Sequence, residues 1–188
     1  MKPVPAPTTP LEGDLVRLRA REQADLSTLN AMFDDPEVLA GLQLTFPQPM
    51  AGIRAWYERT RASDEFVVFT IETLSGREPI GVCALEGIDP RSRSAEFGIW
   101  IGKEHWNKGY GTDATRTTCR FAFQQMNLHR VTLHVLSDSN PKALHTYEKV
   151  GFKVEGHMRD GIFEGGRYQP LTLMGLLANE FDDAGPGK

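Results

Sequence analysis

The sequence has few of the residues that mark several common protein classes. Only two of its 188 residues are cysteines, Cys83 and Cys119, which is too few for a disulfide framework and gives no metal-ligand spacing. No run approaches the roughly 18 apolar residues of a membrane span. The proline-rich first ten residues lack the apolar segment of a secretory signal. These shortages favour a cytoplasmic protein with no structural metal and no membrane partner.

An excess of positive charge is also missing. The chain has 21 basic and 25 acidic residues, which argues against a nucleic-acid surface, and Arg91 and Arg93 form too short a basic cluster to change this. Its 40% hydrophobic content is that of an ordinary folded domain. We therefore expect one domain at 13–181, preceded by a flexible proline-rich segment at 1–12 and followed by a flexible tail at 182–188.

Hydrophobic periodicity predicts an α/β arrangement, a mixed sheet with helices on its faces. Alternating or continuous apolar runs indicate strands at 14–19, 66–73, 79–86, 95–101, 131–136, 152–158 and 168–177. Helical spacing indicates helices at 22–33, 51–61, 110–126 and 141–150. The segment 39–49 reads as an unusually apolar connection, and long loops of this kind are often functional.

The segment Asn107-Lys108-Gly109-Tyr110-Gly111-Thr112, between the fourth predicted strand and a helix, has the features of an anion site. Its glycines permit positive φ and close approach of a ligand to the backbone. Amides at the following helix start, together with the helix dipole, favour a phosphate. Two other interpretations stay open at this point: a dinucleotide-type G-x-G-x-x-G/A turn, with Asp138 further on, or a tight connection without a ligand.

A second element runs from Asn140 to Phe152. Asn140 and Pro141 are typical of a helix start, and Gly151 is typical of a helix end. Tyr147 lies three and four residues after two apolar side chains, so it shares their face and is directed toward a neighbouring strand. A phenol in that position can donate a proton.

With these two motifs, the chain resembles the GNAT superfamily of acetyl-coenzyme A-dependent N-acyltransferases. The similarity extends over about 13–178 and is greatest to the RimJ/RimL-type and spermidine/spermine N-acetyltransferases. The family's Q/R-x-x-G-x-G/A loop corresponds to 106–111, with Trp106 departing at the first position, and its second motif corresponds to 140–152. The runs 155–159 and 166–168 also match this subgroup, whereas Pro170 departs from it.

The resemblance implies a mostly antiparallel mixed sheet of about six to seven strands, splayed near the cofactor and flanked by about four helices. It implies acetyl-CoA as the cosubstrate and an amine as the acceptor. Tyr147 would protonate the departing thiolate, since a phenol pKa of about 10 lies above a thiol pKa of about 8.5. The residues expected to bind the cofactor are Ile99, Trp100 and Ile101 along a strand edge, Asn107, Lys108, Gly109, Tyr110, Gly111 and Thr112 around the pyrophosphate, and Asn140 through its side-chain amide.

The amine must lose a proton, so a general base is required. Glu96 is the first candidate, because alternation in its strand directs it away from the most apolar face, and His134 is the second.

The acceptor stays open between a polyamine-like molecule and a protein N-terminus. Asp34, Asp35 and Glu37 could attract a cation, whereas the apolar segment 39–47 fits a hydrophobic acceptor or a homodimer contact equally well. A non-catalytic CoA-binding regulatory module remains an alternative, and a dinucleotide-binding protein a weaker one.

Overall fold

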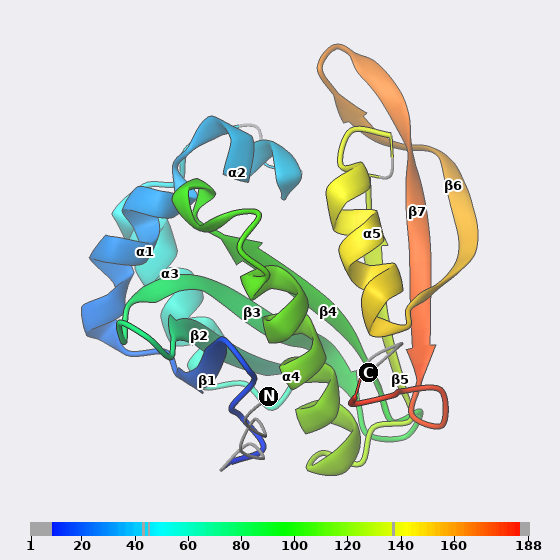
Figure 1. Cartoon of the computed structure of the whole chain (residues 1–188). Helices are drawn as coiled ribbons and strands as arrows, with labels where there is room; N and C mark the ends of the chain where they lie inside the picture. Colours follow the sequence, from blue (N-terminus) through cyan, green and yellow to red (C-terminus); the bar gives the residue numbers. More distant parts are fainter. Residues whose placement is uncertain (1–8, 43, 45, 137, 185–188) are drawn as a thin grey trace.

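The computed structural model describes residues 9–42, 44, 46–136 and 138–184. They form a seven-stranded sheet with the order β1-β2-β3-β4-β5-β7-β6, in which only β4 and β5 are parallel (Figure 1). The predicted mixed, mostly antiparallel sheet is therefore confirmed. The strands are β1 (Val16–Ala20), β2 (Phe66–Thr73), β3 (Pro79–Asp89), β4 (Ser94–Ile101), β5 (Arg130–Val135), β6 (Lys153–Glu164) and β7 (Arg167–Leu177).

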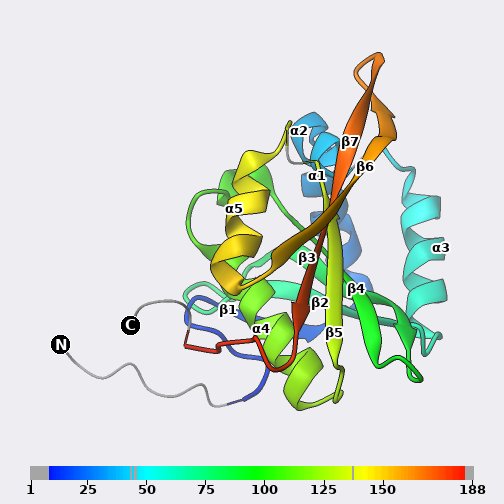
Figure 2. The same ribbon diagram turned by 90° about the vertical axis from the view of Figure 1, so that its right-hand side faces the viewer.

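Helices cover both faces of this sheet. Viewed along its edge, α4 and α5 lie on one side and α3 on the other (Figure 2). The helices are α1 (Leu26–Phe33), α2 (Pro36–Gly41), α3 (Met50–Arg61), α4 (Tyr110–Gln124) and α5 (Pro141–Val150), with 3-10 turns η1 (Gln23–Asp25) and η2 (Lys103–His105). None of the helices in the described ranges is long and apolar enough to cross a membrane.

Helix α2 corrects one expectation, because the apolar connection predicted at 39–49 is helical over its first three positions. Asp35, which follows the C-cap of α1, caps a new helix, since its Oδ1 accepts a hydrogen bond from the Glu37 amide at 2.8 Å. Pro36 then occupies the first helical position, where its missing N–H costs nothing. Two positions of the segment, 43 and 45, lie outside the described residues.

The core lies between the sheet and its helices. Its largest fully buried side chains include Ile71, Leu85, Leu133 and Met174, from four different strands. Cys83 and Cys119 are both buried free thiols within this core.

Strands β4 and β5 pair at only three positions before they part. The last pair is Glu96↔Thr132, after which β4 continues to Ile101 without this neighbour. Beyond Thr132, strand β5 instead keeps its pairing with β7. The sheet therefore opens at its centre, and α4 follows β4 on one side of the opening while α5 follows β5 on the other.

Candidate active site

The loop before α4 presents its backbone to the opening. Asn107 and Gly109 both have left-handed conformations, with φ of 59° and 85°, and α4 begins at Tyr110 immediately afterwards. Amides at a helix start have no intrahelical partner and carry partial positive charge, so this segment can bind an anion. Gly109 is the glycine that the turn requires, because a side chain at this φ is strained.

Trp106 explains why the loop departs from the family's polar first residue. Its indole Nε1 donates to the Ile101 carbonyl oxygen at 2.7 Å, and so ties the loop back to the end of β4. The side chain thus holds the loop in place, and the anion-facing groups remain main-chain amides.

A buried carboxylate fixes the start of α4 from the other side. Asp113 accepts three backbone hydrogen bonds, from the amides of Asp14, Leu15 and Val16, at 3.0, 2.8 and 2.9 Å. A carboxylate near a helix N-terminus is also favoured by the helix dipole. The first turn of α4 is therefore joined to the start of β1, the strand at one edge of the sheet.

Beyond Glu96, one edge of strand β4 pairs with no other strand among the described residues. The Gly102 amide donates to the Ile80 carbonyl of the neighbouring β3 strand, and the β3–β4 register is regular from Gly81↔Ile101 to Glu86↔Glu96. Because the direction of backbone groups alternates along a strand, Ile101 and Ile99 direct their N–H groups to the opposite edge, where β5 has parted. An extended ligand with peptide-like amides can pair with this edge.

A cavity of about 550 Å³, here called the α4–α5 cavity, follows this edge and the loop. Every residue predicted to bind the cofactor lines it except Lys108, whose exposed side chain lies outside. Those lining it are Ile99, Trp100, Ile101, Asn107, Gly109, Tyr110, Gly111, Thr112 and Asn140. Asn140 also caps α5, where its Oδ1 accepts from the Ala143 amide at 3.1 Å, so its NH₂ group is the part left for a ligand.

Tyr147 lies in the wall of the same cavity. Its ring packs edge-on against Phe97, just beyond the last β4–β5 pair, with centroids 6.4 Å apart, and against Phe152 at 6.0 Å. Burial raises the pKa of its phenol to about 12, so the hydroxyl is protonated at neutral pH. A protonated phenol is thus placed at the point where the strands divide.

The two candidate bases form a pair, which the sequence did not predict. His134 Nδ1 lies 2.9 Å from Glu96 Oε1, across the point where β4 and β5 separate. His134 lines the α4–α5 cavity, whereas Glu96 is exposed beside it and is not part of its lining. Strand register explains the contact, since Glu96 pairs with Thr132 and His134 is the next residue on that face of β5.

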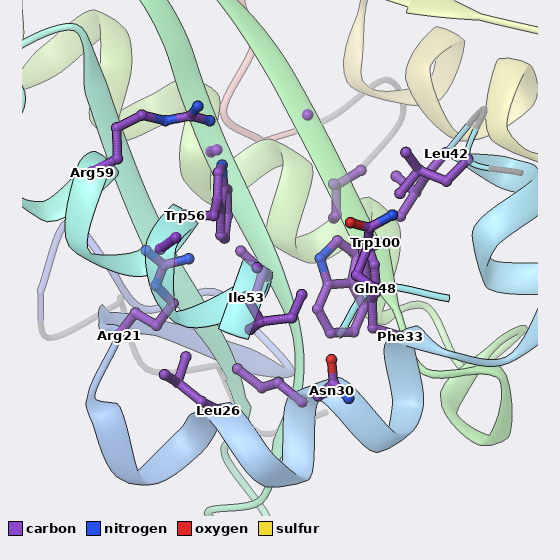
Figure 3. A pocket seen from close by; sticks show the side chains of 18 of the residues that line it. Arg21, Leu26, Asn30, Phe33, Leu42, Gln48, Ile53, Trp56, Arg59 and Trp100 are labelled. Atoms are coloured by element: carbon purple, nitrogen blue, oxygen red, sulfur yellow. The ribbon is translucent and has the colours of Figure 1, made fainter. Parts of the chain in front are cut away.

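A second hollow of about 720 Å³, here called the α1–α3 pocket, lies on the other face of the sheet. Aromatic and aliphatic side chains dominate its lining, with Phe33, Trp56 and Trp100 standing around it (Figure 3). Leu42 and Leu44 of the predicted apolar segment contribute to it. Glu86, which sequence reasoning missed, is its carboxylate.

Three acids that the sequence suggested for attracting a cation do not line this pocket. Asp35 caps α2, Glu37 forms an ion pair with Lys103, and Asp34 accepts a hydrogen bond from the Asn30 side chain. Glu86 lies two residues after the small Ala84 in β3, so both are on the same face of the strand. The sequence alone does not indicate which face of the sheet a pocket occupies.

The two hollows share Leu42, Ile99 and Trp100 in their linings. They therefore meet at the second half of β4, with one hollow reached from the α4–α5 side and the other from the α1–α3 side.

Residues 16–153 match the family described as "Acetyltransferase (GNAT) domain". The chain belongs to this family.

Individual GNAT acetyltransferases are similar to the chain over most of its length. It is 31% identical over 167 residues to the spermidine N(1)-acetyltransferase of Vibrio cholerae, covering 87% of this chain and 94% of that one. It is 35% identical over 102 residues to the putative ribosomal N-acetyltransferase YdaF of Bacillus subtilis, covering 54% and 55%. The crystal structure of the Vibrio cholerae spermidine N-acetyltransferase in complex with CoA and spermine superposes with a TM-score of 0.82 at 30% identity, covering 88% and 96%.

As a GNAT acetyltransferase, the chain transfers an acetyl group from acetyl-CoA to an amine. The predicted family, fold class and cosubstrate are confirmed. The residues present also fit CoA, because the α4–α5 cavity joins an anion-binding helix start to a strand edge with free amides. The dinucleotide interpretation does not hold, since β2, β3 and β4 form an antiparallel meander and not successive parallel βαβ units.

Proposed function

We propose that the chain acetylates a primary amine by direct attack on acetyl-CoA, with both substrates bound at once. The observation that carries this proposal is the shared wall at Ile99 and Trp100. A thioester in the α4–α5 cavity and an amine in the α1–α3 pocket would meet there, and such positioning removes much of the entropic barrier of a two-substrate reaction.

A covalent acyl-enzyme is disfavoured by the environment of the thiols. Cys83 is 1% exposed and Cys119 fully buried, and burial raises the pKa of Cys83 to about 12. The thiolate is the reactive form of cysteine, so neither residue is suited to carry an acetyl group.

We assign roles in the reaction by position. The Ile99 amide, which faces the opening, would stabilise negative charge on the thioester oxygen as the amine nitrogen bonds to the carbonyl carbon. Glu96 and His134 would together accept the proton that the amine loses. Tyr147 would give its proton to the sulfur as the carbon–sulfur bond breaks, since its phenol is neutral and lies on that side of the strands.

Two observations support an amine acceptor bound beside CoA. The similar Vibrio cholerae enzyme is described in complex with CoA and spermine, and this chain covers 96% of it. The α1–α3 pocket also opens on the same face as Glu96, Gly98 and Trp100, where an amine could approach the thioester from the side opposite α4 and α5.

Acetyl-CoA binding and thiol release test this proposal. Acetyl-CoA should raise the melting temperature, because it binds only the folded state. Free thiol should then appear when an amine from a panel of polyamines, amino acids and peptides is added. Stabilisation by acetyl-CoA with no thiol release from any amine would favour the regulatory-module alternative.

We also propose a homodimer built on the β6–β7 hairpin. Strand β6 is an edge of the sheet, and the hairpin exposes Val154, Met158, Phe163 and Tyr168 by 45% to 64%. Exposed apolar side chains gathered on a sheet edge are typical of an association site. Light scattering after size-exclusion chromatography should give twice the chain mass, and Phe163→Glu should give the monomer mass.

Two buried free thiols support the expected cytoplasmic location.

A further inference from the structure

The α1–α3 pocket is apolar but contains three charged residues among the described ones that line it. They are Arg21, Arg59 and Glu86, so positive charge exceeds negative by one. A polyamine brings at least two ammonium groups, and Glu86 could neutralise only one of them. Glu96, the cross-strand neighbour of Glu86, is not among the residues that line the pocket and lies 2.9 Å from His134. An ammonium group buried among aromatic and aliphatic side chains without a carboxylate is costly. The pocket is therefore poorly matched to a polyamine.

Arg21 is a buried cation with free hydrogen-bonding capacity. It is 8% exposed and stacks on Trp56, with its guanidinium carbon 4.2 Å from the ring centroid (Figure 3). The same carbon lies 4.9 Å from the centroid of the Tyr57 ring. Its Nη2 donates to Thr60 Oγ1 at 2.5 Å, but Nε and Nη1 have no hydrogen-bond partner in the part of the chain that the structure describes. Buried polar groups nearly always have partners, so this one calls for an acceptor of hydrogen bonds.

Among the described residues, no carboxylate forms an ion pair with Arg21. The carboxylate that acts on it from nearby, Asp25, has both oxygens bonded to Arg19 instead. Burial lowers the pKa of the Arg21 guanidinium to about 10, so the group is still charged at neutral pH. An anion from outside the chain would offset this cost.

Arg59 adds a second cation at the same pocket. It extends from α3 toward the strands, and the structure gives its guanidinium no hydrogen bond or ion pair to any described residue (Figure 3). Its charge acts on Glu86 through space. A ligand can therefore meet an ammonium-binding carboxylate and two guanidinium groups within one apolar hollow.

We propose that the acceptor is a monoamine with an apolar body and a carboxylate, in the manner of an aromatic amino acid, and not a polyamine. This rests on the proposed function of the site. The ammonium group lies by Glu86 and Gly98, near the shared wall, the apolar body lies among Trp56, Trp100 and Phe33, and the carboxylate meets the guanidinium groups. Arg–carboxylate pairs of this kind are charge-assisted and geometrically specific.

Three amines of matched design test the proposal: phenylalanine, phenethylamine, which lacks only the carboxylate, and spermidine. The expected kcat/KM is at least ~10-fold higher for phenylalanine than for either of the others, as for loss of one charged hydrogen-bonded contact. Arg59→Gln should remove most of this advantage and leave phenethylamine unchanged. Arg54→Gln, on an exposed position of the same helix outside the pocket, should change neither.

Arg21→Gln should have the same effect as Arg59→Gln, and the exposed Arg59 keeps the test valid if the Arg21 variant fails to fold. Calorimetric binding of each amine to the CoA-loaded protein gives a readout that does not need turnover. Equal preference for phenylalanine and phenethylamine, or a preference for spermidine, would overturn the proposal while leaving the acetyltransferase function intact. If acetyl-CoA released no thiol with any of a broad panel of amines, this would instead count against the proposed function.

Discussion

The two hollows that meet at β4 are built in different ways. The α4–α5 cavity depends on main-chain groups: the left-handed Asn107 and Gly109, the start of α4, and the free edge of β4. The α1–α3 pocket depends on side chains from α1, α3, β3, β4 and the segments beside them. A site made of main-chain groups can bind the same ligand even when its side chains are substituted. A site made of side chains changes its preferred ligand when those side chains are substituted. We therefore expect the α4–α5 cavity to tolerate substitutions that would change the ligand of the α1–α3 pocket.

The largest expected effect comes from Tyr147→Phe, on the α4–α5 side. Loss of the phenolic proton should lower kcat by about 100-fold, the lower range for a general acid, and leave stabilisation by acetyl-CoA unchanged. Steady-state thiol release and thermal shift measure the two effects. Tyr168→Phe is the matched control, because that ring is 64% exposed on β7 and away from the opening. A parallel loss of acetyl-CoA binding would show instead that Tyr147 acts mainly by packing on Phe97 and Phe152.

The Glu96–His134 pair lies between the two hollows and should show non-additive losses. Glu96→Gln and His134→Gln should each lower kcat/KM by roughly 10- to 100-fold, at or below the lower end of the usual range for a general base. If they act as one unit, the double variant should be little worse than either single one. Glu65→Gln, on an exposed position before β2, should have no effect. Losses that multiply in the double variant would assign the two residues separate roles.

Most of the residues predicted to bind the cofactor lie around one cavity, because the sequence signals that indicated them are local. The glycines before α4, the Asn140 cap and the alternation of β4 each act within a few residues, and the structure places them around one cavity. Trp106 could not be interpreted in this way, because its bond to Ile101 depends on how the loop folds back.

The acceptor side escaped prediction because it depends on contacts between distant segments. Arg21 and Trp56 are 35 positions apart and come together only when α3 lies beside Arg21, the residue after β1. Glu86 reaches the pocket through the β3–β4 register. The pairing of Glu96 with His134 needs the parallel register of β4 and β5, which sequence alone does not give.

Two glycines, Gly98 within β4 and Gly109 in the loop before α4, sharpen the contrast. Gly109→Ala places a side chain at a φ of 85°, with its Cβ 3.1 Å from Leu15, and should cost about 1 kcal/mol of stability and raise the KM for acetyl-CoA several-fold. Gly98→Ala is its matched control, because a Cβ there meets nothing within 4 Å and points to the α1–α3 side. It should leave stability and the acetyl-CoA KM unchanged and raise only the acceptor KM. Equal effects of both changes on acetyl-CoA would contradict the division into a donor and an acceptor side.

The smallest effect concerns the stability of Glu86→Gln, and its sign is the informative part. Burial, and then the charge of Glu96, raise the pKa of the Glu86 carboxyl above its ordinary value of 4.5. The neutral form is therefore favoured in the folded state, so ionisation lowers stability as the pH rises through the raised pKa. Glu86→Gln should match the parent protein below pH 4.5, gain melting temperature above the raised pKa, and yet raise the KM of the amine at neutral pH. Melting curves from pH 3.5 to 8, beside Glu65→Gln, give the first part, and initial rates give the second. A variant that is more stable and equally active would mean that Glu86 binds no ammonium group. A gain in stability together with a higher KM for the amine is expected if the Glu86 carboxylate binds the acceptor at the expense of stability.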